Sequence, residues 1–87
     1  MSWEDIKIEI SETVEKMMQE RHVLPDEVKI VINYVEKEDG TKLYIPDANR
    51  CLGKKIIGNA TYYVDYFIDN NKYVINSVYV HKAEIQG

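Results

Sequence analysis

Cysteine is almost absent from the sequence, since Cys51 is the only one in 87 residues. A single cysteine excludes an internal disulfide, and it excludes a zinc or iron–sulfur site built from this chain's cysteines alone. Glycine and proline are also scarce, with 4 and 2 residues, and no Gly- or Pro-rich linker divides the chain. We therefore predict a single domain over residues 1–87, with no cofactor of its own.

Long apolar runs are missing as well. No stretch approaches the 18 or so apolar residues of a membrane span. The first residues, MSWEDIKIE, lack the basic and apolar regions of a signal peptide. The sequence therefore predicts no membrane association and a cytoplasmic location.

Basic residues are outnumbered, because 11 Lys and Arg stand against 15 Asp and Glu and give a formal net charge of −4. The only local basic cluster is Arg50, Lys54 and Lys55 in NRCLGKK. Sequence-independent affinity for nucleic acids requires clustered cations, whereas lysines on an edge strand commonly prevent unwanted pairing. We therefore expect no nucleic-acid partner.

A helix is predicted over residues 25–38. Pro25 suits the first turn of a helix, and Asp26 and Glu27 suit its positive end. The apolar residues of this segment recur at helical spacing and form one stripe: Leu24, Val28, Val31, Ile32 and Val35.

The stretch over residues 3–20 allows two interpretations. Apolar residues recur there at spacings of three and four, which favours a helix: Trp3, Ile6, Ile10, Val14 and Met17. The alternative takes IKIEI at residues 6–10 as a short strand and begins a helix after Ser11 as its cap. We favour one helix over residues 3–20, because SETVEKMMQER is helix-forming and no strong turn signal precedes it.

After Gly40 the apolar residues alternate, which indicates strands over residues 42–45, 51–57, 60–68 and 73–82. Gly58-Asn59 and Asn70-Asn71 suit two-residue hairpin turns. The predicted fold class is therefore α+β, with two N-terminal helices packed on a three- to four-stranded antiparallel β-meander.

Two-residue turns fix the register of a hairpin, so the two faces of the last two strands can be worked out. With Asn70-Asn71 as the turn, one face pairs Ile68 with Tyr73, Tyr66 with Ile75, Val64 with Ser77, and Tyr62 with Tyr79. The opposite face pairs Phe67 with Val74, Asp65 with Asn76, Tyr63 with Val78, and Thr61 with Val80.

Both predicted faces are mostly apolar, whereas a sheet with helices on one side normally shows polar residues on the other. A chain of this length buries only about 60 to 65% of its unfolded surface and has no second core. We therefore expect a small non-enzymatic accessory or protein-interaction module that docks on a partner protein or on a second copy. The predicted contact residues are Tyr63, Phe67, Val74, Val78 and Val80.

A small-ligand-binding or catalytic domain is the alternative. Its ligand would lie between sheet and helices, against Tyr62, Tyr66, Tyr79 and His81. No catalytic residue is assigned, because the predicted register places Asp65 on the face opposite His81.

Neither the histidines nor the cysteine indicates a reactive site. His22 and His81 have no carboxylate at ligand spacing, so no metal site is predicted. Cys51 would need an activating base and a lowered pKa to act as a nucleophile. Its position beside Leu52 suits a small apolar residue, while a mixed disulfide or a ligand shared with a partner stays open.

NATYYVDY and YVHK, with LPDEVKIVINYVEKEDGTKLY before them, resemble a small module of roughly this length. The module accompanies glutamate-synthase-like flavin and iron–sulfur oxidoreductases of anaerobic microbes, as an extra C-terminal piece or a separate small subunit. The likeness covers about residues 23–85. The module has Trp at Tyr63, Glu at Asp65, Ser at Val80 and Arg at Lys82. The resemblance implies a redox enzyme as partner and assigns no catalytic residue.

Overall fold

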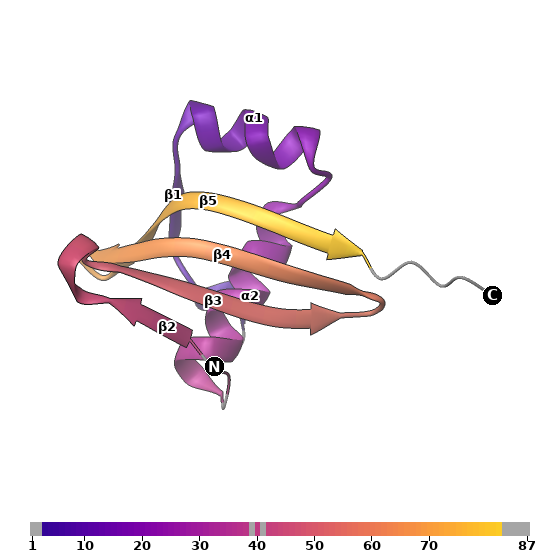
Figure 1. Cartoon of the computed structure of the whole chain (residues 1–87). Coiled ribbons are helices and arrows are strands. Elements are labelled where there is room, and N and C mark those ends of the chain that lie inside the picture. Colours follow the sequence, from indigo (N-terminus) through magenta and orange to yellow (C-terminus); the bar gives the residue numbers. More distant parts are fainter. Residues whose placement is uncertain (1–2, 39, 41, 83–87) are drawn as a thin grey trace.

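The computed structural model describes residues 3–38, 40 and 42–82 (Figure 1). Its elements in chain order are η1 (Trp3–Asp5), β1 (Ile8–Ile10), α1 (Glu12–Glu20), α2 (Pro25–Lys37), β2 (Lys42–Ile45), η2 (Pro46–Ala48), β3 (Arg50–Ile57), β4 (Ala60–Asp69) and β5 (Lys72–Lys82). Among these residues the strands form one sheet in the order β1-β5-β4-β3-β2. The α+β class is confirmed. The sheet differs from the prediction because it has five strands and β1 lies parallel to β5.

The predicted single helix over residues 3–20 is wrong. Residues 8–10 form β1, which pairs with residues 73–75 of β5. The helix begins only after Ser11, whose hydroxyl accepts a hydrogen bond from the backbone N–H of Val14 at 3.2 Å. Alternating Ile8 and Ile10 pack against the core from this strand. Pairing with the edge of β5 therefore outweighs the helical spacing of the same apolar residues.

The core lies between α2 and one face of the sheet, and Figure 1 shows α2 crossing behind the strands. The stripe of α2 is fully buried at Val28, Val31 and Ile32. At Gly53 of β3 the helix comes close to the sheet, since a Cβ there would lie 3.1 Å from a Val35 methyl carbon. Helix α1 packs against β5 near the edge of the sheet.

The two predicted hairpin turns are confirmed. Gly58 has a φ of 65°, and Asn70 and Asn71 have φ values of 49° and 65°. Such angles suit glycine and asparagine better than other residues. The first turn joins β3 to β4, and the second joins β4 to β5.

A β-bulge changes the register between β4 and β5. Tyr66 lies opposite Ile75 as predicted, but Asp65 lies opposite Ser77, so Asn76 is an extra residue in β5. The predicted partners of Tyr66, Phe67 and Ile68 are confirmed. Because a one-residue shift moves each later side chain of β5 to the other face, the predicted partners of residues 61–65 are wrong. Val78 now lies opposite Val64 in the core, and Tyr79 lies opposite Tyr63.

Candidate functional site

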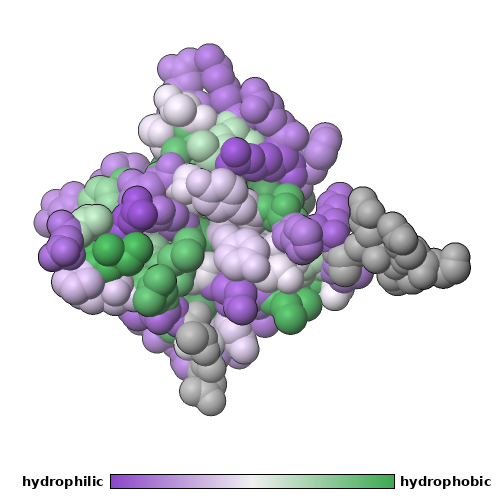
Figure 2. All heavy atoms as spheres, viewed as in Figure 1, coloured by the Kyte–Doolittle hydropathy of each residue, from purple (hydrophilic) through white to green (hydrophobic). Residues whose placement is uncertain are grey.

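The face of the sheet that α2 does not cover carries an unusual number of apolar side chains, and we call it the open face. We assign this face from the strand registers. Its large apolar and aromatic members are Leu43, Ile45, Leu52, Ile56, Tyr63, Phe67, Val74 and Tyr79. Figure 2 looks onto this face and shows hydrophobic and near-neutral spheres lying among hydrophilic ones. Leu43, Ile56 and Tyr79 are 59%, 68% and 49% exposed.

A hydrogen-bonded polar cluster lies among these apolar side chains. One Asp65 carboxylate oxygen lies 3.4 Å from Nη1 of Arg50, and the other accepts a hydrogen bond from the Asn76 amide at 3.4 Å. The bulge brings Asn76 beside Asp65, because it adds one residue to β5 at this point. The Asp65 side chain is only 13% exposed, so its charge is compensated by Arg50 where solvent access is limited.

Arg21, just after α1, reaches the adjoining edge of β5. Its Nη1 donates a hydrogen bond to the Val78 carbonyl at 2.7 Å, and its guanidinium lies 4.8 Å from the centre of the Tyr79 ring. The first contact satisfies a carbonyl on the part of β5 that extends beyond β1. The second is a cation–π contact that holds the Tyr79 ring on the open face.

The structure divides the predicted contact residues between two faces. Tyr63, Phe67 and Val74 belong to the open face. Val78 is 1% exposed in the core, and Val80 packs partly buried against the same core. The bulge at Asn76 causes this division, so Val78 and Val80 are not available for a contact on the open face.

The predicted ligand residues are also divided. The Tyr62 hydroxyl donates to Glu27 of α2 at 2.6 Å, and the Tyr66 hydroxyl donates to Glu36 of α2 at 2.5 Å. Both rings lie on the core side, whereas the bulge places Tyr79 and His81 on the open face. Asp65 is on the same face, so the predicted placement of Asp65 and His81 on opposite faces is wrong. The four side chains therefore do not line one pocket between sheet and helices.

Glu36 is the centre of a polar network under the sheet. Its carboxylate accepts hydrogen bonds from the Tyr66 hydroxyl and from Lys42, each at 2.5 Å. Burial disfavours the charged carboxylate, but the hydrogen bonds from Lys42 and Tyr66 outweigh it and lower the pKa of Glu36. Burial, followed by the hydrogen bond to Glu36, raises the pKa of Tyr66 far above its ordinary value. This network ties α2 to β2 and β4 and is structural in character.

Cys51 is an ordinary buried thiol. It is 5% exposed in the core, and burial is the main cause that raises its pKa above the usual value. A raised pKa keeps the thiol protonated at neutral pH, which disfavours nucleophilic chemistry. This position suits the small apolar role that the sequence indicates.

Two further features concern the described part of the chain. No group of three or more His, Cys, Asp and Glu side chains gathers there as a metal ion would require. None of its helices has the length and apolar character needed to cross a membrane.

The basic cluster of Arg50, Lys54 and Lys55 is divided by its contacts, because Arg50 contacts Asp65 while Lys55 lies 3.9 Å from the centre of the Tyr34 ring.

The predicted contact residues did not include Leu43, Ile45, Leu52 and Ile56, which lie on the open face. A signal was present, because the Gly58-Asn59 turn places Ile57 opposite Ala60 and Ile56 opposite Thr61. Extending this register leads to Leu52 opposite Asp65, and then to Leu43 on β2. The register of the first hairpin therefore predicts the apolar half of the open face that β2 and β3 supply.

Comparisons with family models, with curated proteins and with solved structures gave no significant match. The resemblance to the accessory module of redox enzymes therefore stays a prediction.

Proposed function

We propose that this domain is a non-enzymatic protein-interaction module whose open face packs on the open face of a second copy. The observation that carries the proposal is the open face itself, with eight large apolar and aromatic side chains on a sheet that α2 covers only from behind. Tyr, Phe and Arg are the residues in which protein interfaces are enriched, and Tyr63, Phe67 and Arg50 lie on this face.

The size of the open face suits a stable contact. The five strands contain 36 residues, and each residue occupies about 4.8 Å by about 3.3 Å of the sheet, or about 16 Å². Packing two such faces would bury roughly 600 Å² on each copy, or about 1,200 Å² in total. This area exceeds the roughly 1,000 Å² that a specific protein interface requires. Sheets that pack face to face in this way lie about 10 Å apart.

The charges on the open face favour a second copy over a partner of one sign. Basic Arg50 and Lys54 and acidic Asp65 and Asp69 lie on the same side of the sheet. A two-fold contact brings the same patch of both copies together, so a patch with both signs can complement itself. The Arg50–Asp65 pair is already formed in the single chain, which reduces the cost of burying its charges.

A redox enzyme as a larger partner is a further part of this proposal, and it rests on the resemblance alone. NATYYVDY and YVHK, which carry part of the resemblance, lie side by side in the sheet, since Thr61 pairs with His81 and Tyr63 with Tyr79. They form one end of the open face. In an assembly of that kind the domain would contribute a contact surface rather than chemistry.

The proposal is tested by charged substitutions at exposed leucines. We expect the wild-type chain to dimerise, and Leu43→Lys on the open face to weaken the dimer at least tenfold in sedimentation equilibrium. Leu24→Lys is the matched control, because Leu24 is 63% exposed, close to the 59% of Leu43, but lies at the start of α2. A wild-type chain that stays monomeric at high micromolar concentration would contradict the proposal. Equal weakening by the two variants would also contradict it.

A further inference from the structure

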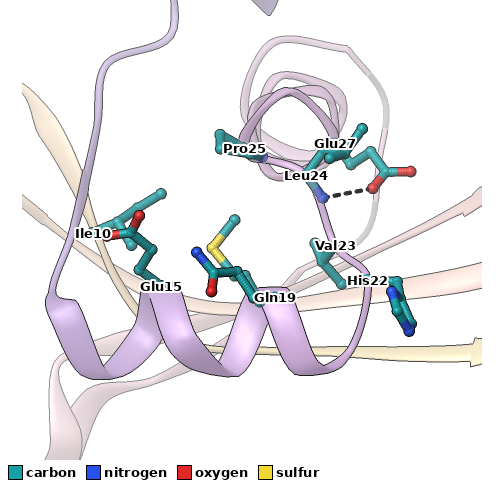
Figure 3. Close-up of a pocket in the computed structure, with 9 residues that line it drawn as sticks. Ile10, Glu15, Gln19, His22, Val23, Leu24, Pro25 and Glu27 are labelled. Atoms are coloured by element: carbon teal, nitrogen blue, oxygen red, sulfur yellow. Dashed lines mark hydrogen bonds between the residues drawn. The ribbon is translucent and has the colours of Figure 1, made fainter.

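A pocket of about 660 Å³ lies between α1 and the first turn of α2 (Figure 3). Its size is within the range of about 300 to 1,000 Å³ that is typical of small-molecule sites. None of its lining residues belongs to the open face. The apolar ones are Ile10, Met18, Val23, Leu24 and Pro25, and the polar ones are Glu15, Gln19, His22 and Glu27.

The connection between the helices leaves this pocket open. Helix α1 ends at Glu20, and His22 turns the chain with a φ of 58°, in the left-handed region. Two residues later Leu24 is the N-cap of α2, and it has no side-chain oxygen that could cap the helix. Leu24 is also 63% exposed. Apolar surface therefore lies open at the mouth of the pocket, and buried Met18 and Val23 belong to the same lining.

Among the described residues, the polar lining carries negative charge and contains no lysine or arginine. Glu27 is already engaged, because one carboxylate oxygen accepts from the Leu24 backbone N–H at 2.8 Å and the other from the Tyr62 hydroxyl at 2.6 Å. Figure 3 shows the Glu27 carboxylate and His22 turned away from the centre of the pocket. They are part of its wall rather than of its interior.

Glu15 has a different position. Figure 3 shows Glu15 rising from α1 beside Ile10, with the Gln19 amide turned toward the same space. Within the described residues Glu15 forms no ion pair or side-chain hydrogen bond, and the ion pair on α1 joins Glu12 to Lys16. Its carboxylate is therefore free to accept hydrogen bonds at the rim of an apolar pocket.

We propose that this pocket binds a small primary amine, with the apolar tail against Met18 and Val23 and the ammonium group at Glu15. An ammonium group has three donors and no acceptor, which suits the Glu15 carboxylate. Burial of the tail supplies the favourable free energy, and the charge selects the head group. A carboxylate of the same length would meet the Glu15 carboxylate, and none of the described lining residues is a lysine or an arginine that could offset the repulsion. This inference is independent of the open face.

The test is an NMR titration of the whole chain with n-octylamine at neutral pH, where the amine is protonated. Labelled methyl groups of Met18 and Ile10 report binding, and sodium octanoate provides the same tail with the opposite charge. We expect saturable shifts of both methyl signals with octylamine, and at least tenfold weaker binding of octanoate. Equal binding of the two compounds, or unmoved Met18 and Ile10 signals, would overturn the proposal.

Substitutions then locate the head group. Glu15→Gln keeps the size of an exposed side chain and removes its charge, and we expect it to weaken octylamine binding at least threefold. Glu20→Gln is the matched control, because it makes the same charge change on α1 at an exposed residue outside the pocket. Circular dichroism spectra of both variants are recorded to check that they fold like the wild type. Equal weakening by the two variants would assign the effect to net charge and would contradict the role of Glu15.

Discussion

Replacing Tyr66 with phenylalanine removes one hydroxyl from the core and keeps the ring in place. Tyr66 is 0% exposed, and its hydroxyl donates to Glu36 at 2.5 Å. A hydrogen bond to a charged group is worth about 1.5 to 3 kcal/mol, and Glu36 retains Lys42 as a second donor. We therefore expect a loss of about 2 kcal/mol in the free energy of unfolding at neutral pH. For a chain of this length that loss lowers Tm by roughly 8 to 16 °C.

The matched control is Tyr73→Phe, measured by urea unfolding with circular dichroism. The Tyr73 ring packs edge-on against Tyr66, with centroids 5.7 Å apart, but its hydroxyl has no hydrogen-bond partner among the described residues. We expect this variant to lose less than about 0.5 kcal/mol. A loss below about 0.5 kcal/mol for Tyr66→Phe, or an equal loss for the two variants, would refute the reasoning.

The loss of stability in Tyr66→Phe should depend on pH. The folded-state pKa of Glu36 is lowered from its ordinary value of 4.5, so the unfolded chain binds more protons in the acid range and stability rises with pH. The contribution of Glu36 is therefore present above about pH 4.5 and is lost as pH falls through the lowered pKa. Tyr66→Phe removes one of the donors that lower this pKa. The difference in the free energy of unfolding between the wild type and Tyr66→Phe should be largest at neutral pH and should become smaller in acid.

Three further predictions concern the bulge, the contact between α2 and the sheet, and the cysteine. Val78→Asp should abolish cooperative unfolding in circular dichroism, because Val78 is 1% exposed. Tyr79→Asp should stay folded. The reverse result would favour a register without a bulge. Gly53→Ala should cost about 1 to 2 kcal/mol in urea unfolding, since its Cβ would lie 3.1 Å from a Val35 methyl carbon, and an unchanged midpoint would contradict the close packing. Iodoacetamide should alkylate buried Cys51 about a hundredfold more slowly in the folded chain than in urea, and equal rates would show an accessible thiol.

The helix α2 and both hairpin turns could be predicted because their signals are local. Pro25 marks the first turn of α2, and Gly58, Asn70 and Asn71 favour the positive φ values that two-residue turns require. The strand β1 could not be predicted with the same ease. Its residues satisfy a helical and an alternating pattern together, and only the free edge of β5 selects the strand.

The bulge had a signal that the turn-based register overlooked. Apolar residues alternate at Tyr73 and Ile75, and then again at Val78 and Val80, with two polar residues between the pairs. An odd spacing of this kind within one strand indicates an extra residue. Because every later side chain changes face at that point, this single residue decides which side chains of β5 after Asn76 lie on the open face.

The proposed contact between the open faces of two copies is tested most directly by an isotope-filtered NOE experiment on a mixture of labelled and unlabelled chains. It detects only protons that are close together in two different copies. We expect intermolecular NOEs between the rings of Tyr63 and Phe67 and the methyl groups of Leu43 and Leu52. The absence of any intermolecular NOE at high micromolar concentration would contradict it. NOEs confined to the edges of the sheet would contradict it as well.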